Sequence, residues 1–183
     1  MWKGALLQIS STDKPKENLE LINNMINSAA AKNVEFVASP ETANCISNSN
    51  LHKETVLQTE KEDITLASLT EVAKKKSIYI LIGSLAIKQN KPKHKFLNRS
   101  FLINPSGSII AKYDKLHMFD ATISDSEEYI ESASFVAGKN AKVISTAIGK
   151  FGLSICYDVR FPHLYRGLSQ RGAQLLTVPA AFT

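Results

Sequence analysis

Phe151-Gly-Leu-Ser-Ile-Cys156-Tyr-Asp-Val-Arg-Phe-Pro162 is an apolar run that turns polar at its cysteine. The apolar half predicts a buried strand and the polar half predicts a turn, so the thiol is expected at the edge of a sheet. A lone cysteine in such a place is more often an inert core residue than a nucleophile. Asp158 and Arg160 crowd polar groups around the turn, and the simplest interpretation is an ion pair that closes it.

Two other strand-like runs also end beside reactive groups. The run from Val34 to Ala38 leads to Glu41, and the run from Ser108 to Tyr113 leads to Lys115. Taken singly, these side chains are a loop acid and a solvated lysine. Beside a thiol, however, a carboxylate can act as general base, and an ammonium can favour the thiolate and stabilise an oxyanion. The three groups together predict a cysteine amidohydrolase.

Three neighbouring residues are candidates for supporting functions. The backbone N–H of Tyr157, directly after the cysteine, is the natural second donor to an oxyanion. Arg160 would suit a substrate carboxylate, unless Asp158 already occupies it. His117 could serve a Cys–His pair, but its place two residues after Lys115 favours a supporting or core histidine.

The remaining pattern predicts a mixed α/β sandwich in a single domain over residues 1–183. Helices are expected from N-cap candidates Ser11-Thr12-Asp13 through Ala29, and over Ile64–Lys76 and Pro162–Arg171. Turns are expected at Asn104–Gly107 and at Gly149-Lys150. Strands are expected at Trp2–Ile9, Val34–Ala38, Ile78–Ile87, Arg99–Ile103, Ser108–Tyr113, Lys142–Ile148, Phe151–Cys156 and Gln174–Val178.

Composition and charge are those of an ordinary soluble globular protein, with 44% hydrophobic residues, 21% charged residues and a net charge of +5. Basic residues cluster in Lys74-Lys75-Lys76 and between Lys88 and Lys95, a predicted hairpin loop that includes Lys91, Lys93 and His94. No stacking aromatics are interleaved with them. This favours a solvated surface over a nucleic-acid site.

Other function classes have little support in the sequence. Cys45 and Cys156 lie far apart in dissimilar surroundings, which predicts free thiols and a cytoplasmic location. No apolar stretch is long enough for a signal peptide core or a membrane span. No glycine-rich phosphate loop follows a strand, and the histidines at 52, 94, 117 and 163 are scattered. We therefore expect no cofactor and no metal.

Three segments resemble the nitrilase superfamily of carbon–nitrogen hydrolases. They are Phe36-Val-Ala-Ser-Pro-Glu41, Tyr113-Asp-Lys115-Leu-His-Met-Phe119 and Gly152-Leu-Ser-Ile-Cys156-Tyr-Asp-Val-Arg-Phe-Pro162. The resemblance covers the whole chain. It implies Glu41 as general base, Lys115 as oxyanion cation and Cys156 as nucleophile. It also implies a four-layer α-β-β-α sandwich that forms homodimers across helices near the cysteine turn.

The resemblance extends to a second carboxylate. Glu131-Ser132 is similar to an element that places an acid beside the catalytic lysine and the substrate, with Glu127 and Glu128 as rival candidates. The cysteine turn and the closing Thr177–Thr183 look most like the amidase branch that acts on small ω-amides of carboxylic acids. That branch includes deaminated-glutathione amidase and ω-amidase. The expected substrate is therefore a small amide rather than a nitrile.

Members of this superfamily continue beyond the length of this chain. The resemblance therefore implies a fold that is incomplete at its C-terminus, with uncovered sheet edges, weak activity and poor solubility. The alternative function is a non-catalytic domain that keeps only the dimerisation or interaction surface.

Overall fold

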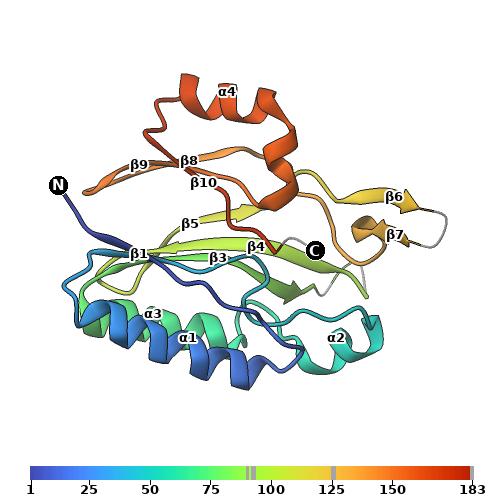
Figure 1. The fold of residues 1–183 in the computed structure, drawn as a ribbon, viewed down its shortest axis with the longest axis horizontal. Coiled ribbons are helices and arrows are strands. Elements are labelled where there is room, and N and C mark those ends of the chain that lie inside the picture. The colour runs from blue at the N-terminus through green and yellow to red at the C-terminus, as the bar shows by residue number, and fades with distance from the viewer. Residues whose placement is uncertain (90, 92–93, 125–126, 182–183) are drawn as a thin grey trace.

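A computed structural model describes residues 1–89, 91, 94–124 and 127–181, without the side chains of residues 123 and 127. Expectations for Lys93, for the side chain of Glu127 and for residues 182–183 lie outside this part. The described chain forms four layers (Figure 1). Helices α1 (Pro15–Ala30) and α3 (Ile64–Lys76) cover one sheet, a second sheet lies on its other face, and α4 (Pro162–Gln170) covers the second sheet. The predicted α-β-β-α sandwich is confirmed.

The first sheet has five strands in the order β1-β2-β3-β4-β5 and the second has three in the order β10-β9-β8. Strands β1, β2 and β3 run parallel, whereas β3, β4 and β5 are antiparallel neighbours. The strands of the two sheets are β1 (Gly4–Leu6), β2 (Phe36–Ala38), β3 (Tyr79–Lys88), β4 (Phe96–Ile103), β5 (Ile109–Asp114), β8 (Lys142–Thr146), β9 (Gly149–Leu153) and β10 (Leu175–Thr177).

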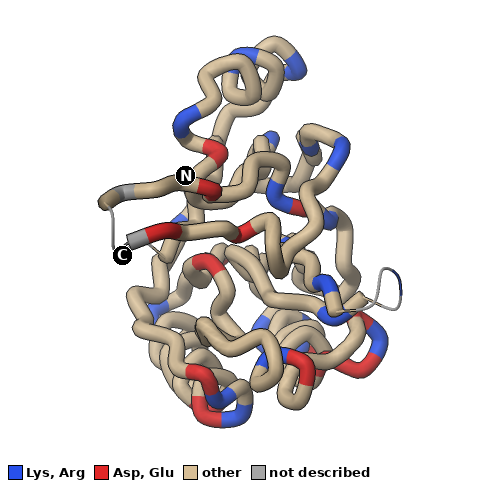
Figure 2. Tube along the Cα trace, turned by 90° about the vertical axis from the view of Figure 1, so that its right-hand side faces the viewer, with Lys and Arg blue, Asp and Glu red and all other residues tan. Residues whose placement is uncertain are grey.

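Helix α3 has the bounds that its sequence pattern predicts. The Asp63 side chain caps its start by accepting a hydrogen bond from the Leu66 N–H at 2.8 Å. Lys74, Lys75 and Lys76 form its last turn, where cations interact favourably with the helix dipole. The first basic cluster thus has a structural explanation. Figure 2 shows basic and acidic positions interspersed along the chain.

The strand β3 is buried on both faces, as its continuous apolar run predicts. On one face it packs with the helices, through a core cluster that includes Ile22, Leu69 and Ile82. On the other face the two sheets meet, and the Phe36 and Phe151 rings stack with centroids 5.2 Å apart. This inter-sheet core also contains Cys156, which is 9% exposed.

Three local predictions are wrong. Helix α1 is preceded by Lys14 without a side-chain cap, because Thr12 instead pairs with the buried Asn18 side chain. The β8–β9 turn falls at residues 147–148, because Gly149 is already paired with Thr146. The strand before Cys156 ends at Leu153, since the chain turns away toward a short 3₁₀ helix.

Two further elements lie outside the sheets. Strands β6 (Asp120–Ser124) and β7 (Glu127–Ile130) form a hairpin that the sequence pattern does not predict. It leads into the 3₁₀ helix η1 (Glu131–Ala133). Helix α2 (Asn50–Val56) lies within the polar stretch between β2 and α3. In the described part of the chain, no helix has the length and apolarity needed to cross a membrane.

Candidate active site

A bulge in β3 positions Glu41. The β3–β4 register shifts between Ile82 and Leu85, and the Ser84 side chain in this bulge accepts a hydrogen bond from the Thr42 N–H at 2.8 Å. The adjacent Gly83 passes so close to the loop after β2 that a Cβ there would lie 2.1 Å from the Ser39 carbonyl oxygen. The bulge therefore fixes the backbone on both sides of Glu41.

Three donors converge on the Glu41 carboxylate, which is 5% exposed. Its Oε1 accepts from Asn98 Nδ2 at 2.8 Å and from Lys115 Nζ at 2.9 Å. Its Oε2 accepts from the Ala181 N–H at 2.9 Å. In Figure 1 the red segment after β10 descends from the second sheet to the first, which brings Ala181 to this carboxylate.

Lys115 lies between two carboxylates. Besides Glu41, its ammonium contacts both oxygens of Glu131, at 3.0 and 2.8 Å, and its side chain is only 3% exposed. Burial by itself would lower the pKa of Lys115. The charges of Glu41 and Glu131 and their hydrogen bonds outweigh burial and hold that pKa above its usual value. The ammonium is therefore a fixed positive charge.

Glu131 is the second carboxylate of the site, as the resemblance implies. It begins η1, and its Oε2 also accepts from the Phe119 N–H at 2.7 Å. Its rival Glu128 is exposed on β7. The unpredicted β6–β7 hairpin is what brings Glu131 back to Lys115, because it reverses the chain between Phe119 and η1.

Cys156 sits on a sharp turn, the first residue of the 3₁₀ helix η2 (Cys156–Arg160). Its φ is +45°, a left-handed conformation that costs a non-glycine residue about 1–3 kcal/mol. Its N–H donates to the Pro179 carbonyl at 2.9 Å. The Asp158 side chain caps the same turn by accepting from the Ile155 N–H at 2.9 Å. These contacts hold the thiol where a strand end alone would not place it.

The electrostatics of the thiol differ from the simple expectation. Burial, together with the charge of Glu41 and a hydrogen bond to it, raises the pKa of Cys156 to about 12. Lys115 lowers that pKa, as expected, but its effect is smaller. Lys115 therefore shifts the pKa of Cys156 in the expected direction, but the opposing effects of burial and Glu41 are larger. At neutral pH the residue is therefore a protonated thiol.

Asp158 connects the cysteine turn to the segment that carries Lys115. This fully buried carboxylate accepts from the Tyr113 hydroxyl at 2.6 Å, and its other oxygen lies 2.7 Å from His117 Nδ1. The predicted ion pair between Asp158 and Arg160 is wrong, because these partners occupy Asp158 and Arg160 is exposed. His117 has the supporting function expected of it, and its ring stacks on Phe161 at 3.5 Å.

The comparison with known protein families agrees with this geometry. A sequence model described as carbon-nitrogen hydrolase matches residues 3–182. The chain belongs to the carbon–nitrogen hydrolase family. The family that the resemblance indicated is thus shown, and the functions of Glu41, Lys115 and Cys156 stay predictions.

Individual family members are similar over almost the whole chain. A deaminated glutathione amidase from Synechocystis is 38% identical over 183 residues, which cover 98% of this chain and 66% of that protein. The crystal structure of C. elegans NitFhit superposes with a TM-score of 0.88 at 32% identity, covering all of this chain and 45% of the other. Nit3 from Saccharomyces cerevisiae gives 0.84 at 30% identity, covering 100% and 65%. The chain thus spans about two thirds of the length of the Synechocystis amidase and less of the NitFhit chain.

The functions expected of Tyr157 and Arg160 in the site stay predictions. The Tyr157 ring packs edge-on against Phe119 and Phe161, at 5.0 and 5.5 Å. Its backbone N–H stays a predicted oxyanion donor. Arg160 is exposed at the end of η2, and among the ion pairs of the described residues none includes it.

Sequence reasoning missed several groups that complete the hydrolase site. Asn98 donates to both carboxylates, to Glu41 at 2.8 Å and to Glu131 at 3.3 Å. The contacts of Pro179 and Ala181 were also missed. A backbone N–H leaves no signal in a sequence, so only the path of the chain reveals it.

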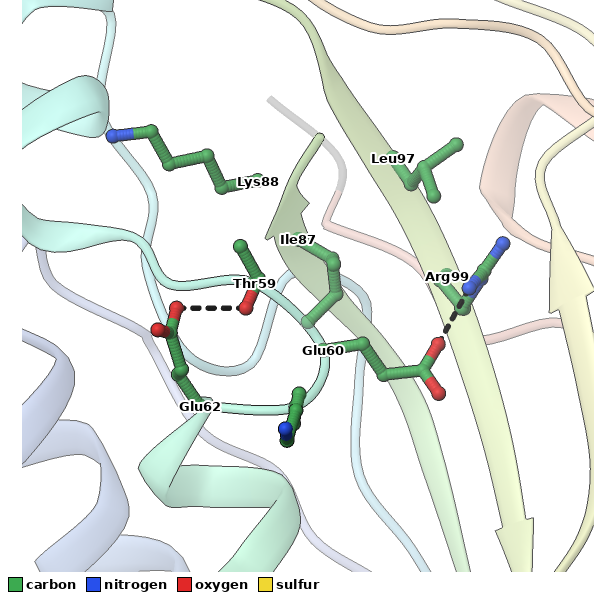
Figure 3. A pocket seen from close by; sticks show the side chains of 8 residues that line it. Thr59, Glu60, Glu62, Ile87, Lys88, Leu97 and Arg99 are labelled. Atoms are coloured by element: carbon green, nitrogen blue, oxygen red, sulfur yellow. Dashed lines mark hydrogen bonds and ion pairs between the residues drawn. The ribbon is translucent and has the colours of Figure 1, made fainter. Parts of the chain in front are cut away.

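The opposite face of β4 carries a separate polar cluster. Arg99 follows Asn98 and therefore points away from the site. Its guanidinium bonds Asp114 and Glu60, each with a shortest distance of 2.5 Å, and Lys112 also pairs with Glu60. Figure 3 shows Arg99 and Glu60 facing each other beside a cavity of about 500 Å³. The lining of this cavity includes none of Glu41, Lys115 and Cys156.

Proposed function

We propose that the chain carries the catalytic site of an amidase that releases ammonia from a small ω-amide of a carboxylic acid. The observation that carries the proposal is the buried Glu41–Lys115–Glu131 cluster beside the strained turn of Cys156. Similarity to deaminated glutathione amidases supports the substrate class.

The mechanism begins as the sulfur of Cys156 attacks the amide carbon while Glu41 accepts the thiol proton. The Lys115 charge stabilises the oxyanion, aided by the Tyr157 N–H. Collapse of this intermediate breaks the C–N bond, and Glu41 returns the proton to the leaving ammonia. Water, deprotonated by Glu41, then hydrolyses the thioester, which releases the acid and restores the thiol. In this scheme Glu131 holds Lys115 in place.

The general base is essential because burial and Glu41 raise the pKa of Cys156 to about 12. Without a base, almost no thiolate would exist at neutral pH. A carboxylate beside the thiol removes the proton only as the new bond forms. The negative charge of Glu41 therefore disfavours a free thiolate, but it also allows Glu41 to accept the thiol proton during the attack.

Acyl-enzyme trapping tests this function. Incubation with a short ω-amide such as succinamate should release ammonia and add an acyl mass to the peptide that contains Cys156. Cys156→Ala should abolish both signals, whereas Cys45→Ser should keep them, because the Cys45 thiol contacts the Asp13 carbonyl oxygen at 3.6 Å and has neither Glu41 nor Lys115 as an electrostatic neighbour. Ammonia release that persists in Cys156→Ala would refute the assignment.

Further proposals concern the molecule as a whole. We propose that residues 1–183 form one carbon–nitrogen hydrolase domain that pairs into homodimers, and that Tyr157 and Arg160 contribute to substrate binding. The free thiols of Cys45 and Cys156 fit a reducing, cytoplasmic location. Size-exclusion chromatography with light scattering tests the dimer. A dimer that never forms an acyl-enzyme would favour the non-catalytic alternative.

A further inference from the structure

Lys53 is a buried lysine that forms no ion pair with any acidic residue in the described part of the chain. It projects from α2, is 6% exposed, and its Nζ lies 5.6 and 5.2 Å from the ring centroids of Phe96 and Phe135. Among the hydrogen bonds and ion pairs of the described residues, none gives this Nζ an acceptor. The aromatic faces offset part of the lost hydration, but an ammonium removed from water is best stabilised by an anion.

The two rings connect Lys53 to the catalytic carboxylates. Phe96 and Asn98 lie two residues apart on β4, so their side chains share one face of the sheet at a spacing of about 7 Å. Asn98 is the residue that donates to Glu41 and Glu131. Phe135 donates its N–H to the Glu131 carbonyl at 2.9 Å. The ammonium thus lies over Phe96, on the face of β4 that also carries Asn98.

The electrostatic surroundings agree with this placement. Burial lowers the pKa of Lys53, and the neighbouring Cys45 and Glu131 oppose that shift only in part. The influence of Glu131 shows that the ammonium is within electrostatic reach of the catalytic cluster. An anion bound at Lys53 would favour its charged form further.

The other cations near β4 and η2 are occupied or exposed. Lys115 is bonded to both catalytic carboxylates, and Arg99 is paired with Asp114 and Glu60 on the opposite face. Arg160 is exposed at the end of η2. We propose that the Lys53 ammonium binds the free carboxylate of the ω-amide substrate and so selects anionic over neutral amides, an inference that rests on the proposed function.

Paired ligands test this selectivity directly. Succinamate and butyramide share the same chain length, but butyramide has a methyl group in place of the carboxylate. Calorimetry on the Cys156→Ala chain, which cannot turn the ligands over, should show tighter binding of succinamate. Lys53→Met keeps the apolar stem over the two rings, and should reduce the succinamate-to-butyramide preference by about tenfold, the loss typical of one charge-assisted contact. Butyramide binding should stay unchanged.

Lys88→Met is the matched control. Lys88 lies on the same face, opposite Phe96 in the β3–β4 register, but it is already paired with Glu54 at 3.0 Å. Removing its charge should leave the preference intact. The inference is overturned if Lys53→Met leaves the succinamate-to-butyramide preference unchanged, or if Lys53→Met and Lys88→Met reduce it equally. In either case, binding of butyramide would still support an amide site. Failure of both ligands to bind rejects the inference and counts against the proposed function as well.

Discussion

Two opposite charges act on the Cys156 thiol from within one buried cluster. Glu41 raises the pKa of the thiol and Lys115 lowers it, while burial adds to the effect of Glu41. The two residues are bonded to each other at 2.9 Å, so each change at one also affects the other. Substitutions of Glu41 and of Lys115 should therefore shift the pKa of Cys156 in opposite directions, although both should reduce turnover.

Glu41→Gln should lower the pKa of Cys156 and yet reduce turnover. The change removes the charge that favours the protonated thiol, so thiolate absorbance at 240 nm should appear at lower pH than in the parent chain. Turnover should fall by about 10²- to 10⁴-fold, the usual contribution of general acid–base catalysis. Both are measured in a Cys45→Ser background, which removes the second thiol.

Lys115→Met provides the opposite case. Loss of the ammonium should move the pKa of Cys156 upward, because Lys115 is the cation that lowers it. Turnover should fall here too, for lack of a charge at the oxyanion. Titrations that shift in the same direction in the two variants would contradict the assigned electrostatics.

The conformation of the turn η2 depends on the Asp158 side chain. Asp158 accepts from Ile155, Tyr113 and His117, and so ties the cysteine turn to the end of β5. Asp158→Asn places an N–H₂ group against these donors. We expect a loss of about 1–3 kcal/mol in unfolding free energy, measured in urea, together with slower acylation of Cys156.

Arg160→Ala controls for position within the same element. Arg160 is exposed, so its loss should change the unfolding free energy by no more than about 0.5 kcal/mol. An Asp158→Asn chain that is as stable as the Arg160→Ala chain, and whose Cys156 is acylated as fast as in the parent chain, would show that the network has no positioning effect.

The β3 bulge makes a second prediction at the level of elements. Gly83→Ala forces a Cβ to within 2.1 Å of the Ser39 carbonyl oxygen and should cost about 1–3 kcal/mol of stability. Gly167→Ala in α4 meets no atom within 4 Å, and should stabilise the chain by about 0.5–1 kcal/mol through helix propensity. Thermal melts of both variants should shift in opposite directions.

At the scale of the whole molecule, the contact between the two sheets holds the site together. Glu41 follows β2 and Lys115 follows β5, both strands of the first sheet, whereas Cys156 follows β9 of the second. Phe151→Ala removes the ring that stacks on Phe36 and should cost about 3–5 kcal/mol in urea unfolding. Leu51→Ala, at a side chain that is 80% exposed, should change it by no more than about 0.5 kcal/mol. Equal effects would indicate that the sheets are not packed as described.

Local patterns predicted the elements whose signals are local. The bounds of α3, the β4–β5 turn and the start of α4 at Pro162 follow from caps, turn residues and apolar periodicity. The β6–β7 hairpin was missed because its strands are short and polar, and its pairing depends on neighbours. The turn of Cys156 was placed too close to the strand, because a left-handed residue other than glycine has no sequence signal.

The identities of Glu41, Lys115 and Cys156 and their order along the chain can be read from the sequence, because a family resemblance preserves residue types. Their chemistry depends on contacts across the fold. Glu41 meets Asn98, Lys115 and Ala181 across 57, 74 and 140 residues. The raised pKa of the thiol follows from burial between two sheets, and burial exists only once the sheets have packed. Lys53 was unremarked in the sequence for the same reason: a lysine is distinctive only when its neighbours leave it buried and unpaired.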